Sequence, residues 1–129
     1  MLNRKLEFNR KLRRKITSED FTPIKLVNEM LNKLPEKCFT ENQTFCDPAA
    51  GDGNFLVEVL KRKLLKFEPL QALSTIYGVE LMLDNVEYMK RRLLEFIPNK
   101  FHVEAKNILN KNIICHDALT WNFNNWKSK

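Results

Sequence analysis

The chain has 129 residues, a length that suits one folded domain, and its 43% hydrophobic and 29% charged residues are typical of a globular protein. No apolar run approaches the roughly 18 residues of a membrane span, and the basic start lacks the apolar core of a secretory signal. Three cysteines and two histidines without a CxxC pair exclude a disulfide framework and a Cys/His zinc site. We therefore expect a reduced cytoplasmic protein with no membrane partner, no metal site and cysteines that pack as small apolar residues.

The net charge of +6 arises entirely within the first 16 residues. This segment holds seven basic residues against Glu7, so the other 113 residues sum to zero. The basic residues are Arg4, Lys5, Arg10, Lys11, Arg13, Arg14 and Lys15. The apolar residues of the segment fall on one helical stripe, which predicts a basic amphipathic helical arm over residues 1–16. Two interpretations stay open, because the arm either packs this stripe with its charges in water or attracts nucleic acid.

Strands and helices alternate along the rest of the chain, residues 17–129. Thr22 as an N-cap before Pro23 predicts a helix that Pro35 closes, and residues 36–43 indicate a polar connection. The expected strands are residues 44–46, 75–80 and 112–117. Three later helices are expected: one that begins at Asn54, one over residues 85–96 with Asp84 as its cap, and one over residues 101–109. This order predicts an α/β fold with a parallel, doubly wound sheet. The aromatic residues Trp121 and Phe123 alternate as in a strand.

Each predicted strand ends in a carboxylate, namely Asp47, Glu80 or Asp117. Ligands of open parallel sheets bind outside the carboxyl ends of the strands. The turn Gly51-Asp52-Gly53 lets a ligand approach the backbone, and Glu80 follows at the spacing of an acid that binds ribose hydroxyls. The turn is neither GxGxxG nor a P-loop, so a nicotinamide dinucleotide or a nucleoside triphosphate is disfavoured.

Four segments together resemble a known family. They are Phe21-Thr22-Pro23, the run DPAAGDGNFL from Asp47 to Leu56, Gly78-Val79-Glu80-Leu81, and His116-Asp117-Ala118. In this order they resemble the first four motifs of the S-adenosylmethionine-dependent DNA adenine-N6 methyltransferases of restriction–modification systems and phages. The resemblance covers residues 17–119. It implies a truncated Rossmann-like methyltransferase sheet of about three parallel strands with helices on both faces, in a bacterial or phage-infected host cytoplasm.

The resemblance also implies a cofactor, S-adenosylmethionine, and the residues that hold it. Thr22 and the turn from Asp47 to Gly53 would hold the methionine part, Glu80 the ribose hydroxyls, and Asp117 the adenine amino group. The full implied cofactor-binding set is Phe21, Thr22, Asp47, Pro48, Ala49, Gly51, Asp52, Gly53, Phe55, Glu80, Leu81, Asp117 and Ala118.

One family motif has no counterpart in this chain. The catalytic Asn/Asp/Ser-Pro-Pro-Tyr/Phe motif needs adjacent prolines, and none of the five prolines has a proline neighbour. In the family this motif binds the target amino group and stacks the flipped base. We therefore expect no catalytic residue here, and methyl transfer to DNA adenine only if another chain supplies the missing half. The alternatives are a non-catalytic remnant or regulator that binds the cofactor or its product, and a basic nucleic-acid adaptor without a cofactor.

The missing half also bears on the sheet. In methyltransferases of this type the strand with the catalytic motif lies beside the first strand, so residues 44–46 would form an open edge. An open apolar edge is a template for pairing with another chain. We expect either the aromatic tail or another chain to cover it, and favour self-association or a second methyltransferase subunit, with DNA contacted through the arm or the partner.

Overall fold

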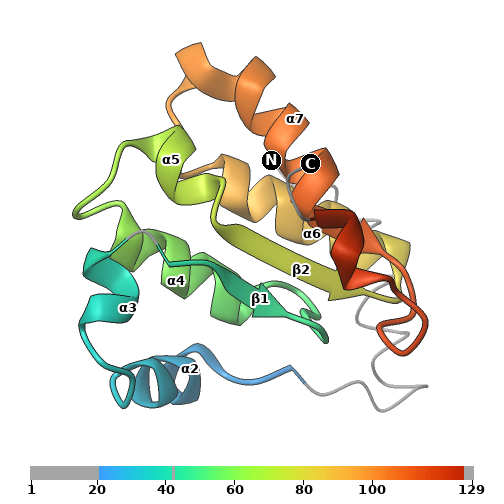
Figure 1. Ribbon diagram of the computed structural model, residues 1–129, viewed down its shortest axis with the longest axis horizontal. Coiled ribbons are helices and arrows are strands. Elements are labelled where there is room, and N and C mark those ends of the chain that lie inside the picture. The colour runs from blue at the N-terminus through green and yellow to red at the C-terminus, as the bar shows by residue number, and fades with distance from the viewer. Residues whose placement is uncertain (1–20, 42, 127–129) are drawn as a thin grey trace.

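The computed structural model describes residues 21–41 and 43–126, so the predicted arm over residues 1–16 lies outside the described residues. The strands are β1 (Phe45–Asp47), β2 (Ile76–Glu80) and β3 (Ile113–Cys115). The helices are α2 (Ile24–Leu31), α3 (Lys37–Thr40), α4 (Asn54–Lys63), α5 (Pro69–Leu73), α6 (Leu83–Leu94) and α7 (His102–Asn112), with 3-10 helices η1 (Asn99–Phe101) and η2 (Phe123–Trp126) (Figure 1).

The strands form one parallel sheet in the order β1-β2-β3. Asp47 lies opposite Gly78, and Glu80 lies opposite Cys115, so the carboxyl ends of the strands meet at one edge of the sheet. The three-stranded parallel sheet flanked by helices confirms the expected truncated Rossmann-like α/β fold. Each strand was placed correctly from its apolar run, with bounds that differ by one or two residues.

The two faces of the sheet carry different contacts. Gly78 faces α4, because a Cβ atom on it would lie 2.8 Å from the Leu56 Cδ1 atom. Tyr77, the preceding residue, faces the opposite way and its ring packs at 5.0 Å from that of Trp126 in η2. Figure 1 shows η2, in red, in front of the end of β2 and α6 behind it. An apolar core thus fills one face, and an aromatic cluster covers part of the other.

The core between the sheet and its helices is built from the apolar stripes of α4 and α6. Leu60, Met89 and Leu93 are fully buried there. Burying a side chain of this size contributes about 1.5–3 kcal/mol, so this packing holds α6 against α4 and the sheet. The glycine turn begins α4, and this packing therefore fixes the turn beside α6.

Several predicted boundaries were wrong for local reasons. Pro23, with an extended backbone, is the N-cap of α2, and Thr22 makes no capping bond there. The helix ends at Leu31, four residues before Pro35, because the backbone tightens into turns with bonds from Lys33 to Met30 and from Leu34 to Leu31. Helix α6 begins at Leu83, so Asp84 lies in its first turn instead of capping it.

Three further segments differ from the prediction. The expected polar connection contains α3, whose Phe39 ring stacks on Phe45 at 5.4 Å. Helix α5 was not predicted, since its five residues are too short for a helical period. The tail forms η2 and not a strand, because the Trp126 ring packs on Tyr77 and its Nε1–H donates to the Lys111 carbonyl at 3.0 Å.

Within the described residues, β1 is an edge strand. Phe45 donates its backbone N–H to Thr75 at 2.8 Å on the β2 side. Successive residues of a strand direct their backbone groups to opposite sides, so those of Cys46 face away from β2. Cys46 and Cys115 are exposed, which contradicts the expectation that all three cysteines are buried. Over residues 21–41 and 43–126, no helix has the length and apolar character to cross a membrane.

Candidate functional site

The three predicted carboxylates lie at the carboxyl edge of the sheet. Asp47 ends β1 and Glu80 ends β2, while Asp117 follows β3 by two residues. The backbone N–H of His116 donates to the Glu80 carbonyl at 3.0 Å, which keeps the segment after β3 beside the end of β2. Asp117 itself is exposed, and its Oδ1 accepts the Leu119 N–H at 2.9 Å.

The glycine turn connects β1 to α4 in a tight path. The Asp47 Oδ1 atom accepts the Ala49 N–H at 3.0 Å, and Ala50 donates its N–H to the Val79 carbonyl at 3.0 Å. Gly51 and Gly53 then adopt φ angles of +56° and +89°, which favour glycine. A Cβ atom on Gly51 would lie 2.9 Å from the Phe21 ring. The turn is therefore shaped by backbone conformation and by close packing together.

Glu80 is tied to this turn and to the start of α6. Its Oε1 accepts the Gly51 N–H at 3.2 Å, and its Oε2 accepts the Met82 N–H and the Asn85 Nδ2–H, both at 3.0 Å. Each carboxylate oxygen has two acceptor positions. Counting donors from the described residues alone, Oε2 is saturated, while Oε1 keeps one acceptor position that a ligand hydroxyl group could fill. Glu80 is half-buried, so that position is fixed in direction and still reachable.

A small cavity of about 110 Å³ lies on the other side of the turn. It is lined by Phe21, Thr22, Asp47, Ala49, Ala50, Gly51, Asp52, Asn54 and Phe55. Seven of these residues belong to the set predicted from the sequence. Of the remaining predicted residues, Gly53 belongs to the turn and is buried, and Glu80 contacts the turn by accepting the Gly51 N–H. Leu81 follows the end of β2 and is 63% exposed. Pro48 and Asp117 are also exposed, and Ala118 is half-buried.

The pKa of the Asp47 carboxyl group, which lines this cavity, is raised from its ordinary value. Burial raises the pKa of its carboxyl group, and the nearby Glu80 charge raises it further, while the bond from the Ala49 N–H lowers it. A negative charge held in a partly buried position favours a positively charged group beside it. The cavity therefore suits a ligand with an ammonium group.

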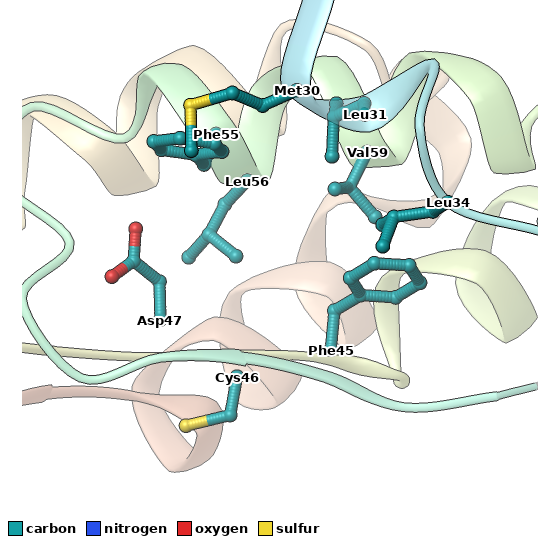
Figure 2. Close-up of a pocket in the computed structure, with 9 residues that line it drawn as sticks. All are labelled: Met30, Leu31, Leu34, Phe45, Cys46, Asp47, Phe55, Leu56 and Val59. Carbon is teal, nitrogen blue, oxygen red and sulfur yellow. The ribbon is translucent and has the colours of Figure 1, made fainter. Parts of the chain in front are cut away.

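A second, larger cavity of about 310 Å³ runs along the open side of β1 between α2 and α4. We call it the β1 groove; its lining residues are Met30, Leu31, Leu34, Phe45, Cys46, Asp47, Phe55, Leu56 and Val59. Figure 2 shows Phe45 and Asp47 pointing toward α4, with the Asp47 carboxylate below the Phe55 ring, and Cys46 pointing away. Asp47 and Phe55 line both cavities, so they form the wall between the groove and the turn.

Three polar residues of the site were not predicted from the sequence. Asn54 lies within the run from Asp47 to Leu56, and its position directly after Gly53 is the signal that could have marked it. Asn85 is fully buried beside Glu80, and Arg92 donates to the carbonyl of Asp52 at 2.9 Å. Both lie on α6, and nothing in the sequence around them indicates that this helix packs against the turn. Within the described part of the chain, no group of three or more His, Cys, Asp or Glu side chains could hold a metal ion.

Comparison with known proteins gives one informative match. No protein-family model matches the chain, and no solved structure gives a significant match. The chain is 36% identical over 75 residues to the type II methyltransferase M.VspI of Vibrio sp. (strain 343). The matched segment is 58% of this chain and 16% of that protein, so the chain spans a small part of its relative's length. The similarity supports a methyltransferase relationship for this chain.

Proposed function

We propose that this chain binds S-adenosylmethionine as the cofactor-binding part of a DNA adenine-N6 methyltransferase. The main support is the Glu80 carboxylate, which is fixed by three protein donors and keeps one acceptor position on Oε1 beside the glycine turn. A nucleoside ribose offers hydroxyl donors for such a position. The similarity to a type II methyltransferase supports the same cofactor class. When bound, the cofactor would supply a methyl group on a positively charged sulfur.

The residues around the turn fit the parts of this cofactor. The cavity beside Asp47 and Asp52 suits the ammonium group of methionine, because these two acidic side chains line it, and Thr22, which also lines it, carries a hydroxyl donor for the methionine carboxylate. The exposed Leu81 side chain offers an apolar surface to an adenine ring. Asp117 would accept a hydrogen bond from the adenine amino group. This assignment places the adenosine end at Glu80 and the methionine end in the 110 Å³ cavity.

Isothermal titration with S-adenosylmethionine and S-adenosylhomocysteine tests the proposal. Replacing Glu80 with Ala removes a charged acceptor worth about 1.5–3 kcal/mol, so affinity should fall roughly 10- to 150-fold. Glu104→Ala is the matched control, because Glu104 is an exposed acid on α7. Absence of binding by the unmodified chain, or equal binding by the Glu80→Ala variant, would refute the proposal.

Transfer of a methyl group needs groups that this sequence does not contain, since it has no adjacent prolines. We propose that the chain transfers methyl groups to DNA adenine only with a partner that supplies the catalytic motif and the target-recognition surface. Such an assembly would act in the cytoplasm of a bacterium or of a phage-infected host. Tritiated methyl groups should enter duplex DNA with that partner present and not with this chain alone.

The second candidate is a non-catalytic module that binds the cofactor or its demethylated product. A binding module of this kind needs the glycine turn and Glu80, both of which this sequence contains. The two candidates differ in whether methyl transfer occurs once the cofactor is bound. Tighter binding of S-adenosylhomocysteine than of S-adenosylmethionine, with no methyl transfer in the presence of the partner, would favour the binding module.

A further inference from the structure

Arg92 connects α6 to the glycine turn through a single nitrogen atom. Its Nη1 donates to the Asp52 carbonyl at 2.9 Å and to the Asn54 Oδ1 atom at 2.8 Å. The same nitrogen lies 3.8 Å from the Asp52 carboxylate, and these two side chains are only 18% and 16% exposed. An ion pair with so little water around it interacts more strongly than a pair on the surface. The Arg92 guanidinium thus connects α6 to the turn at Asp52 and Asn54.

The contact extends from the turn to the segment before α2. The Asn54 side chain accepts from Arg92 with its oxygen and donates with its Nδ2 to the Thr22 carbonyl at 2.7 Å. Because both ends of the amide are used, its orientation is fixed. Phe21, next to Thr22, lies against Gly51 in the cavity wall. Arg92, Asn54 and the Thr22 carbonyl therefore form one chain of bonds, here called the Arg92 relay.

The relay supports only one side of the proposed site. It reaches the residues at the 110 Å³ cavity, whereas Glu80 is held by Gly51, Met82 and Asn85. Among the described residues, the polar contacts of Arg92 go to Asp52 and Asn54 and not to Glu80. Gly51 belongs to the turn and lines that cavity, so the two ends of the site share this one contact, while the other two donors to Glu80, Met82 and Asn85, bond to it without Arg92.

We propose that Arg92 is a positioning residue that fixes the methionine-binding wall of the site and leaves the adenosine-binding end unaffected. The inference rests on the proposed function, because that function assigns the two ends. A guanidinium that donates to a backbone carbonyl and a side-chain oxygen holds the geometry of both, and geometry fixed before binding improves affinity. The Arg92 relay also uses both polar ends of the Asn54 side chain, which directly follows the turn.

The test compares two ligands that share the adenosine end, S-adenosylhomocysteine and adenosine. Arg92→Leu should lower the affinity for S-adenosylhomocysteine at least about tenfold and leave that for adenosine within about twofold. Arg92→Lys should recover part of the loss, since one ammonium can donate to the same two oxygens. Lys90→Leu is the matched control, because Lys90 lies on the same helix and donates to Asn110 on α7. Equal losses for both ligands, or no loss for either, would overturn the inference.

Hydrogen exchange without ligand gives a second measurement. Removing the cation should loosen the turn, so Arg92→Leu should speed exchange of the Asn54 backbone amide at least about tenfold. Asn54→Ala should lower S-adenosylhomocysteine affinity while the ion pair between Arg92 and Asp52 remains. Unchanged exchange would contradict the relay. Failure of the unmodified chain to bind either ligand would instead refute the proposed function, while the exchange result would still decide the relay. If Arg92→Leu does not fold, Arg92→Lys and Asn54→Ala carry the same comparison.

Discussion

Replacing Gly53 with Ala tests how the turn is fixed in the core. Gly53 has φ +89°, and a Cβ atom there would lie 2.7 Å from Cγ of Met89, which is fully buried. The left-handed backbone costs a non-glycine residue about 1–2 kcal/mol, and overpacking a core costs about 1–3 kcal/mol more. We therefore expect Gly53→Ala to lower the free energy of unfolding by about 2–5 kcal/mol, a large part of the 5–15 kcal/mol typical of a domain.

Gly51 is the matched comparison in the same turn. A Cβ atom on Gly51 would meet the Phe21 ring at 2.9 Å, and that ring is half-buried and can shift into the cavity. Gly51→Ala should therefore lose only the backbone cost of about 1–2 kcal/mol. Asparagine tolerates positive φ, so Gly51→Asn should regain part of this loss, whereas Gly53→Asn should not, because its Cβ still meets Met89.

Urea denaturation followed by circular dichroism measures these differences in the free energy of unfolding. In thermal unfolding, the melting temperature should fall by about 4 °C per kcal/mol, hence by about 8–20 °C for Gly53→Ala. In a double-mutant cycle, Gly53→Ala with Met89→Ala should cost about 1–3 kcal/mol less than the sum of the single variants, since the overlap with the Met89 Cγ atom is removed. A Gly53→Ala cost no larger than that of Gly51→Ala, or an additive cycle, would refute the reasoning.

A buried lysine, the basic arm and the open strand each give a further expectation. Burial lowers the pKa of the Lys63 amine to about 8 from its ordinary 10.5, so between these values the unfolded chain binds a proton that the folded chain has lost. Stability relative to Lys63→Met should therefore rise by about 1–3 kcal/mol from pH 7.5 to 10 in urea denaturation, and a flat difference would contradict this. If the arm binds phosphates, a plot of the logarithm of the binding constant for nonspecific DNA against the logarithm of salt concentration should have a slope that approaches about −6, the limit for seven contacts. Equal DNA binding by a chain without residues 1–16 would assign the arm to packing. The sedimenting mass should rise over a tenfold concentration range. Cys46→Pro should prevent this rise, because proline removes the Cys46 N–H that faces the open side of β1. A strictly monomeric chain would contradict self-association.

The sequence predicted the elements whose signal is local. Apolar runs placed the three strands, and the isolated glycine pair at 51 and 53 marked the turn at which the cavity lies. The predicted residues between Asp47 and Phe55 come together because a strand, a turn and a helix are consecutive in the chain. Glu80 joins them across a single strand–helix–strand unit, whose length the spacing from Gly53 already indicated.

The residues that support the turn could not be predicted in the same way. Asn85 and Arg92 look like ordinary polar residues of an amphipathic helix, and their partners lie five and 40 positions away. Their role depends on the angle at which α6 packs against α4, which no local pattern specifies. The tail shows the opposite error, since its aromatic alternation suggested a strand while the Trp126 ring packs against Tyr77 as part of a 3-10 helix.

The distribution of charge separates ligand binding from attraction to nucleic acid. The 113 residues after the arm carry no net charge, and the charged residues at the glycine turn are mostly acidic, so this part of the chain offers no positive excess that would draw a polyanion toward the site. Three carboxylates, those of Asp47, Asp52 and Glu80, lie at the turn, and Arg92 lies 3.8 Å from that of Asp52. Such a site can bind a small ligand with mixed charges equally well at low and moderate salt, because partly buried pairs are weakly screened. Any strongly salt-dependent contact with DNA must then come from the arm or from a partner.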